Sequence, residues 1–329
     1  MNVPEWVWIL TLGLTSVFLF VDVLIIGRRP HVPSVRETGG LLVFFITLAV
    51  LFGVGVWYFS GAEFAAQYFA GWVTEYSLSI DNLFVFLIIM AKFGVPEKLQ
   101  QSALMVGIVI ALILRGVFIA VGAVAINRFS WIFYIFGAFL VYSAVNLARE
   151  GESDVDEFEE NRLLKWVEAR FPATNRWHGT KLFIQANGKR IITPMLIVIL
   201  ALGTTDLLFA LDSIPAIFGL TQEPFLVMTA NIFALMGLRQ LYFLLGGLLK
   251  RLVYLGVGLA ILLAFIGAKL ILHALHVNEL PFINGGQPVT GAPDISIGES
   301  LTVIIGILVV TTITSLLKSR KDNRALRSD

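Results

Sequence analysis

The sequence predicts an all-α polytopic membrane protein, and three observations support this fold class. The chain of 329 residues is 57% hydrophobic but only 14% charged, whereas soluble domains carry about 25% charged residues. Its mean hydropathy is +0.84. Apolar runs of about 18 residues or more, each long enough to cross a hydrocarbon core of roughly 30 Å, recur along almost the whole chain. Because so few charges could not cover a water-facing surface, we expect a lipid bilayer around the protein and no nucleic-acid partner.

The apolar runs predict about nine transmembrane helices in a single transporter domain that spans residues 1–329. The helices are expected at about 5–27, 41–59, 72–91, 101–126, 130–148, 192–219, 225–247, 252–273 and 299–317. The first run lacks the positively charged segment that precedes the apolar core of a cleaved signal peptide. We therefore interpret it as a retained helix.

The basic residues predict the orientation of the chain. Twenty of the 24 Lys and Arg residues fall in loops or tails on one side of the predicted membrane domain. Loops that carry an excess of Lys and Arg stay in the cytoplasm. The pattern therefore predicts an outer N-terminus, a cytoplasmic C-terminus and a location in the plasma (inner) membrane.

The longest predicted loop, residues 149–191, lies on the cytoplasmic side. It begins with an acidic run and continues with the amphipathic stretch NRLLKWVEARF at 161–171. This composition is typical of a solvated linker followed by a helix at the membrane surface. A sensor or docking role for the loop is the alternative.

An acidic motif is repeated in the third and sixth predicted helices. The third helix contains EYSLSIDNLFVF, which begins at Glu75, and the sixth contains DLLFALDSIPAI, which begins at Asp206. In each motif a second acid follows the first by six positions, and a small polar residue comes next. A single offset of 131 residues pairs Glu75 with Asp206, Asp81 with Asp212, and Asn82 with Ser213.

The repeat extends beyond the motifs. The helix after each motif carries one arginine, Arg115 in the fourth helix and Arg239 in the seventh. Residues of about 72–148 and 192–273 therefore form two units of three predicted helices. Because three is an odd number, the two units enter the membrane from opposite faces. Such inverted repeats are typical of secondary transporters, whose sites lie near the midplane between the repeats.

Acids within a membrane helix point to a functional site, because a central Asp costs about 2.5–3.5 kcal/mol even on the lenient insertion scale. Four acids and two arginines leave a net charge that one divalent cation or two protons would neutralise. Carboxylates, the amides of Asn82 and Asn231, and the hydroxyl of Ser213 are oxygen ligands, which suit Mn²⁺, Ca²⁺ or Mg²⁺. The chain has no Cys, and its four His are scattered, which argues against Zn²⁺ and copper.

The spacing of the acids leaves two geometries open. On a straight helix, residues six positions apart point about 120° away from each other. Either the helix unwinds between the two acids, as Pro215 would permit in the sixth helix, or the acids serve two sites in series. Lys269, near the outer end of the eighth helix, is expected to extend its amine toward the interface.

Other functional classes are weighed against transport. Acids and arginines that form buried ion pairs would only hold the helices together. A membrane scaffold or insertion-assisting factor would tolerate Asn at all four acids. A channel would conduct ions without coupling to protons. An intramembrane aspartyl protease would need flanking motifs that the sequence lacks, so we expect no enzyme activity.

At these motifs the chain resembles the TerC family of integral membrane proteins, which was named for an association with tellurium resistance. The segments EYSLSIDNLFVFLIIMAKFGVP, TTDLLFALDSIPAIFG and NIFALMGLRQLYFLL carry the resemblance. It implies about nine membrane helices, kinship with the lysine-exporter superfamily and, for several members, export of Mn²⁺ from the cytoplasm. It also implies functional roles for the four motif acids and for Asn82 and Ser213, which follow them.

The acidic motifs and the resemblance together predict a divalent cation exporter that works by alternating access, with Mn²⁺ as the first candidate substrate and Ca²⁺ as the second. Asp81 and Asp212 are expected to form the central site, and Glu75 and Asp206 to complete or gate it. Exchange for protons suits the excess of acids. We expect no tightly bound cofactor. The alternative is a scaffold or assembly factor linked to tellurium or stress resistance without transport.

Overall fold

The structure is a computed structural model that describes residues 1, 3–28, 33–150, 174, 176–186, 189–245, 254–289, 291–293 and 295–325. At some positions within these ranges, Asp22 and Asp81 among them, only the backbone is described. The amphipathic stretch at 161–171 and most of the acidic run before it lie outside the described residues.

Nine long helices make up most of the described chain. They are α1 (Glu5–Arg28), α2 (Val35–Ser60), α3 (Ala62–Lys92), α4 (Glu97–Arg128), α5 (Ile132–Glu150), α7 (Pro194–Phe218), α8 (Pro224–Leu245), α9 (Leu255–His276) and α10 (Ile297–Ala325). Eight of them are long and apolar enough to cross a membrane, and α1 has a shorter apolar stretch, Glu5–Phe18, among its described residues. The predicted all-α polytopic membrane fold is therefore confirmed.

Glycine and proline set several helix boundaries. Gly61 alone separates α2 from α3 and has φ of 99°, a conformation that only glycine adopts without a steric cost. Proline is the first residue of α7 (Pro194) and of α8 (Pro224), where its missing N–H has no helical partner to lose. These local signals explain why most predicted boundaries lie close to the observed ones.

The start of α3 was predicted wrongly. The helix begins at Ala62, whereas the hydropathy pattern placed its start at about 72. The extension reads AEFAAQYFAG, which is rich in the strongest helix former, alanine. Its polar residues Glu63 and Gln67 made it too polar for a membrane-spanning run, although they leave its helix propensity high.

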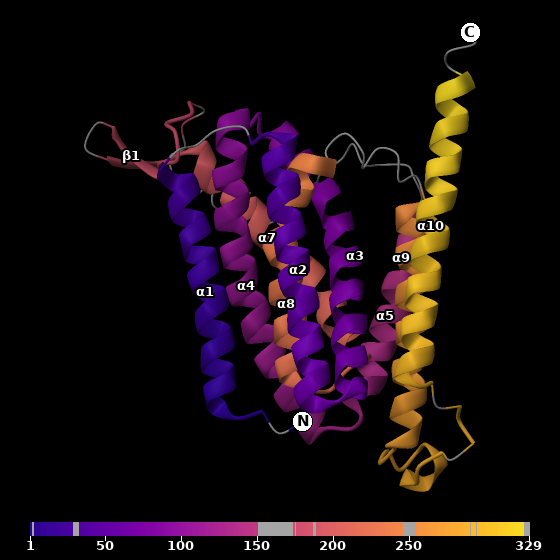
Figure 1. Cartoon of the computed structure of the whole chain (residues 1–329). Coiled ribbons are helices and arrows are strands. Elements are labelled where there is room, and N and C mark those ends of the chain that lie inside the picture. The colour runs from indigo at the N-terminus through magenta and orange to yellow at the C-terminus, as the bar shows by residue number, and fades with distance from the viewer. Residues whose placement is uncertain are drawn as a thin grey trace.

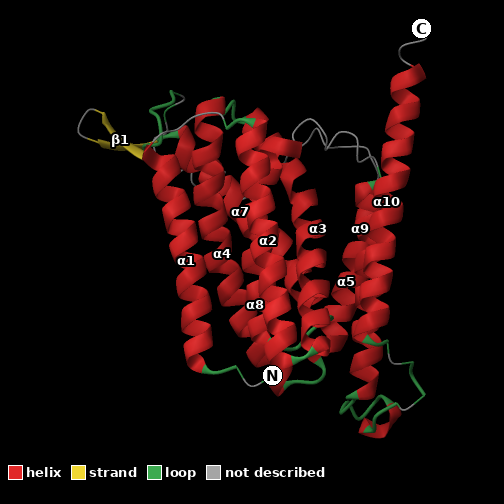
Figure 2. Cartoon of the chain, in the orientation of Figure 1, coloured by secondary structure: helices red, strands yellow, loops and turns green. Residues whose placement is uncertain are grey.

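The loops lie at two opposite ends of the bundle (Figure 1). The hairpin of β1 (Phe183–Ala186) and β2 (Lys189–Ile192) is at the end that also holds the C-terminus, while the N-terminus and the α9–α10 loop are at the other end. The two strands pair antiparallel, and they form the one sheet among the described residues (Figure 2). This hairpin was not predicted, because residues 149–191 were interpreted as a loop with an interfacial helix.

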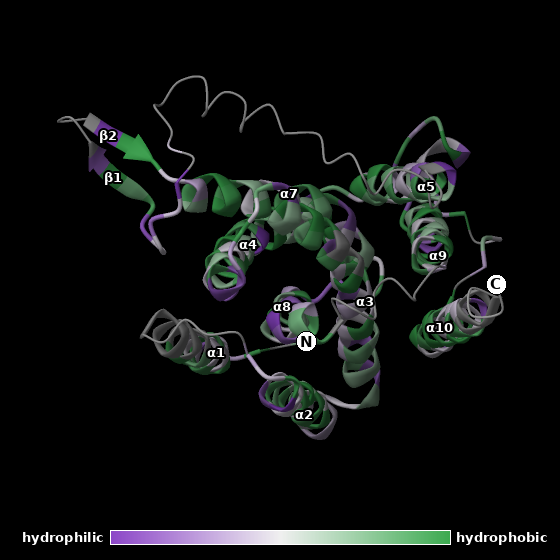
Figure 3. Ribbon diagram, turned by 90° about the horizontal axis from the view of Figure 1, so that it is seen from above, coloured by the Kyte–Doolittle hydropathy of each residue, from purple (hydrophilic) through white to green (hydrophobic). Residues whose placement is uncertain are grey.

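Burial differs strongly between central and peripheral helices. Seen from above, α8 lies among α2, α3 and α4 (Figure 3), and it packs against all three. Of the residues in the most apolar stretch of α8, 94% are buried inside the structure, whereas the corresponding share for α10 is 17%. Peripheral α10 exposes Val310, Ile313 and Leu317, as expected where lipid replaces water as the surrounding medium.

The helices of the two predicted repeats pack in reciprocal pairs. α3 packs against α8, α4 packs against α7, and α5 packs closely along α9. Two glycines permit the last approach. A Cβ atom on Gly137 would lie 2.9 Å from the carbonyl oxygen of Gly267, and a Cβ atom on Gly267 would lie 2.9 Å from the carbonyl oxygen of Gly137.

The helices that carry the acidic motifs are not broken between the two acids of each motif. α3 runs through Asp81, and α7 runs through Pro215 to Phe218. Pro215 lies one turn before the end of α7, and its carbonyl oxygen still accepts the N–H of Gly219 at 3.0 Å. The unwound helix, one of the two predicted geometries, is therefore not observed. The other geometry, in which the two acids serve two sites in series, remains.

Candidate functional site

The site is built around Arg115, an arginine of α4 that is 1% exposed. Its Nε donates to Oδ2 of Asp206 at 3.0 Å and its Nη2 donates to Oδ1 of the same carboxylate at 3.1 Å. This two-point contact matches the planar fork of the guanidinium to the carboxylate. The third nitrogen, Nη1, forms an ion pair with Oε1 of Glu75.

Two neutral oxygen atoms complete the surroundings of Arg115. Nη1 also donates to Oδ1 of Asn231 at 3.0 Å and to Oγ of Ser213 at 3.3 Å. The amide nitrogen of Asn231 donates to the carbonyl oxygen of Val227 at 3.2 Å, which turns its oxygen toward the arginine. Five oxygen atoms from α3, α7 and α8 thus surround one guanidinium group.

Helical periodicity explains which motif residues meet here. Asp206 and Ser213 are seven positions apart on α7, which is close to two full turns, so they lie on one face. On α3, Ser79 follows Glu75 by one turn and donates to its Oε1 at 3.3 Å. Asn82 is seven positions after Glu75 and is buried on the same face of α3.

Asp212 does not belong to the Arg115 cluster. It is half-buried, and its Oδ1 accepts a hydrogen bond from Oγ of Ser143 in α5 at 2.7 Å. Its position six residues after Asp206 turns it toward a different neighbour. The side chain of Asp81, the expected partner of Asp212, lies outside the described residues.

The seven predicted ligands therefore divide into four groups. Arg115 brings together Glu75, Asp206, Ser213 and Asn231; Asp212 lies apart from them, Asn82 is buried nearby along α3, and the side chain of Asp81 is not described. Sequence reasoning overlooked Ser143. Its signal was a hydroxyl at the centre of α5, whose sequence is otherwise mostly apolar.

One buried carboxylate oxygen has no hydrogen-bond partner among the described residues. It is Oε2 of Glu75, a residue that is 0% exposed. Trp72 Nε1, Thr74 Oγ1 and Tyr76 OH, close by on α3, are also buried without a hydrogen-bond partner in the described part of the chain. Because buried polar groups are almost always satisfied, this stretch of α3 is unusual among the described residues.

The donor set suits a hard cation, although the observed arrangement is held by an arginine. Two carboxylates, an amide oxygen and a hydroxyl are the ligands that Mn²⁺, Ca²⁺ and Mg²⁺ prefer. Among the described residues, no group of three or more His, Cys, Asp or Glu is placed to hold a metal ion. Counted formally, the carboxylates of Glu75 and Asp206 and the guanidinium of Arg115 carry a net charge of −1.

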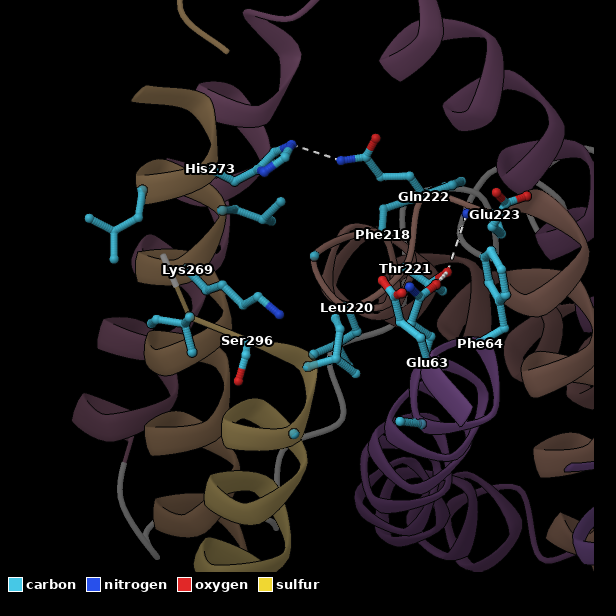
Figure 4. A pocket seen from close by; sticks show the side chains of 18 of the residues that line it. Glu63, Phe64, Phe218, Leu220, Thr221, Gln222, Glu223, Lys269, His273 and Ser296 are labelled. Atoms are coloured by element: carbon cyan, nitrogen blue, oxygen red, sulfur yellow. Dashed lines mark hydrogen bonds between the residues drawn. The ribbon is translucent and has the colours of Figure 1, made fainter. Parts of the chain in front are cut away.

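A cavity of about 760 Å³ opens at the end of the bundle that holds the N-terminus (Figure 4). It is lined by the start of α3, the α7–α8 loop, α9 and the start of α10. Lys269 lines it, is 9% exposed and donates to Oγ of Ser300 at 2.8 Å. The lysine is thus buried in this cavity, and the expectation that it extends to the interface was wrong.

Tightly packed small and apolar residues lie between this cavity and the Arg115 cluster. Gly71 is on α3 between Gln67, which lines the cavity, and Glu75. A Cβ atom on Gly71 would lie 3.3 Å from Ile217 of α7 and 3.6 Å from Ala230 of α8. At the level of Gly71, α3 is therefore in close contact with α7 and α8.

Comparisons with known proteins give the family. A sequence model of the integral membrane protein TerC family matches residues 60–323. An uncharacterized membrane protein of Mycobacterium tuberculosis is 47% identical over 323 residues, covering 97% of this chain and 81% of the relative. The "Putative membrane-bound redox modulator Alx" of Escherichia coli is 35% identical over 309 residues, covering 91% and 90% of the two chains.

A membrane protein of Myxococcus xanthus is 36% identical over 313 residues and covers 95% of this chain and 92% of the relative. No solved structure matches the chain. The match of the family model extends from the start of α3 to the end of α10 and includes both acidic motifs, Arg115 and Asn231. The chain belongs to the TerC family of integral membrane proteins.

Proposed function

We propose that this protein exports a divalent cation, Mn²⁺ first, across the plasma membrane by alternating access. The observation that carries the proposal is the set of oxygen atoms around Arg115. Glu75 and Asp206 lie near the middle of their membrane helices and are 0% and 1% exposed. Ionisable groups at this depth are expensive and mark ion pathways.

The reciprocal packing supports two inverted repeats of three helices. If α3, α4 and α5 correspond to α7, α8 and α9, the contact of α3 with α8 corresponds to the contact of α7 with α4. The contact of α5 with α9 joins two corresponding helices. The contact between Gly137 and Gly267 is reciprocal in the same way. Contacts of this type are the mark of a two-fold relation, and transporters with inverted repeats bind their substrates between the repeats.

The geometry favours Glu75 and Asp206 as the central carboxylates. This differs from the expectation that Asp212 is part of the centre, because Asp212 contacts Ser143 of α5 while Asp206 contacts Arg115 of α4. We propose that Asp212 provides a second position in series. The cavity beside Lys269 is then the outer vestibule, and the contact of Gly71 with Ile217 and Ala230 is the closed outer gate.

The name of the Escherichia coli relative suggests a link to redox balance, which is compatible with this proposal. This chain contains no Cys, so it has no thiol with which to exchange electrons. We propose that a redox effect would instead act through a transported cation. Mn²⁺ is redox-active, whereas Ca²⁺ is not, which places Mn²⁺ first.

The test is flux of Mn²⁺ and of Ca²⁺ from loaded proteoliposomes. Wild type is compared with Glu75→Gln and Asp206→Asn, and the control is Glu97→Gln at the exposed start of α4. We expect gradient-driven Mn²⁺ efflux in wild type and in the control, and loss of efflux in both site variants. A wild-type protein that moves neither ion would contradict the proposal.

One rival function is favoured by a specific observation. Each nitrogen of the Arg115 guanidinium has an acceptor among Asp206, Glu75, Asn231 and Ser213, which would also suit a purely structural clamp in a membrane scaffold. A clamp gains nothing from the unsatisfied Oε2 of Glu75. If Glu75→Gln and Asp206→Asn retain cation flux and lose only stability, the clamp is the better account.

A further inference from the structure

We infer that Arg115 is a tethered counter-cation, which occupies the transport site whenever the transported ion is absent. The inference rests on the proposed function and concerns the step in which the empty carrier returns. It assigns to Arg115 the role that the sequence analysis gave to exchanged protons.

The guanidinium lies where a divalent ion would have to bind. Its nitrogens contact Glu75, Asp206, Asn231 and Ser213. Together these four residues offer a hard cation two carboxylates, an amide oxygen and a hydroxyl. The contacts to Asp206, Asn231 and Ser213 range from 3.0 to 3.3 Å.

The ion and the guanidinium cannot share these oxygen atoms. Hard divalent cations bind oxygen at about 2.0–2.6 Å, so the ligands would have to close around a centre that Nη1 of Arg115 now occupies. Four acceptors of Arg115 lie within reach of such a centre because they already converge on Nη1 or its neighbour. Binding of the ion therefore requires Arg115 to leave, and departure of the ion lets it return.

The charge of Arg115 makes this exchange useful. An empty site with Glu75 and Asp206 ionised would place two negative charges in a region from which water is excluded, since both side chains are almost fully buried. A proton could neutralise them, but a guanidinium is charged at every physiological pH and is already attached to the protein. The carrier can therefore return without taking up a proton from the outer side.

The free oxygen of Glu75 is the part of the site that the arginine leaves unfilled. Oε2 of Glu75 has no hydrogen-bond partner among the described residues, although Oε1 is bound by Arg115 and Ser79. Because both contacts go to Oε1, Oε2 stays available to an incoming ion. Glu75 would therefore bind the ion first, and Asp206 would be released from Arg115 second.

The experiment compares two kinds of Mn²⁺ movement in proteoliposomes. Net efflux into Mn²⁺-free buffer requires the empty carrier to return, whereas tracer exchange with equal Mn²⁺ on both sides requires only the loaded carrier to reorient. For Arg115→Ala we expect net efflux to fall by about tenfold or more while tracer exchange persists, because only the empty form loses its counter-charge. Mn²⁺ binding should tighten, since a competing cation is gone.

Two variants make the comparison specific. Arg115→Lys keeps the charge and should recover part of the net efflux, whereas Arg128→Ala removes an exposed arginine from the same helix and should change neither movement. If Arg115→Ala retains net efflux, the inference is overturned while the proposed function stands. Equal loss of efflux and exchange in both Arg115→Ala and Arg115→Lys also overturns it, because a structural role predicts that pattern.

A measurement on the wild-type protein does not depend on how the variants fold. Net Mn²⁺ efflux is followed at equal pH on both sides, with a pH-sensitive dye inside the vesicles and with potassium and valinomycin to balance charge. We expect Mn²⁺ to leave without stoichiometric proton entry. One or more protons entering for each Mn²⁺ would show that protons fill the empty site. If wild type moves no Mn²⁺, the proposed function and this inference both fail.

Discussion

The two acids of α7 share one motif but lie in different surroundings. Asp206 is 1% exposed and accepts two hydrogen bonds from the guanidinium of Arg115. Asp212 is half-buried and accepts one hydrogen bond from the hydroxyl of Ser143. Six residues along an unbroken helix separate them by about 120°, so they face different helices. The pair of acids on α7 therefore marks two positions, each with its own partner.

The largest expected effect is a difference in the free energy of unfolding between variants that lack Asp206 and variants that lack Asp212. Asp206→Ala removes one partner of a buried ion pair and leaves Arg115 without its two-point contact, which costs about 3–5 kcal/mol. Asp212→Ala removes a single hydrogen bond at a half-buried position, which costs about 0.5–1.5 kcal/mol. Thermal unfolding of the two variants in the same detergent measures the difference.

Equal destabilisation by the two substitutions would contradict this comparison. It would mean that Asp212 takes part in a network as strong as that of Asp206. The matched control is Glu97→Ala at the exposed start of α4, which should leave the unfolding temperature almost unchanged.

Much of this contrast could be predicted from the sequence, and the rest could not. Hydropathy located the nine helices, and the motif spacing indicated that Asp206 and Asp212 either break α7 or face apart. Which of these occurs depends on the packing of α7 against α4 and α5. The pairing of Arg115 with Glu75 and Asp206 is likewise a contact between helices distant in the chain.

The second prediction concerns a substitution in α5, which should affect the surroundings of Asp212 and not those of Asp206. Gly137→Ala places a Cβ atom 2.6 Å from Cγ1 of Ile271 and 2.9 Å from the carbonyl oxygen of Gly267. The backbones of α5 and α9 must separate, at a cost of about 1–3 kcal/mol. Because α5 also carries Ser143, the hydrogen bond to Asp212 should weaken, while the Arg115 cluster stays intact.

Gly55→Ala is the control for this substitution. A Cβ atom at Gly55 in α2 meets no atom within 4 Å, so alanine should be neutral there or stabilise the helix by up to about 1 kcal/mol. Thermal unfolding and tracer exchange of Mn²⁺ are measured for both variants. A Gly137→Ala protein as stable as wild type would show that α5 and α9 are not held at the observed distance.

The smallest expected effect isolates the hydrogen bond of Asp212. Ser143→Ala removes the donor at 2.7 Å and should destabilise the protein by about 1 kcal/mol. Ser143→Thr keeps a hydroxyl and should retain most of the stability. If Asp212 is a second position in series, the freed carboxylate should also bind Mn²⁺ more readily during passage. Ser143→Ala would then lower the KM for efflux while leaving efflux at saturating Mn²⁺ nearly unchanged. An unchanged KM together with the expected loss of stability would mean that Asp212 only anchors α7 to α5, and the pathway would then rest on Glu75 and Asp206.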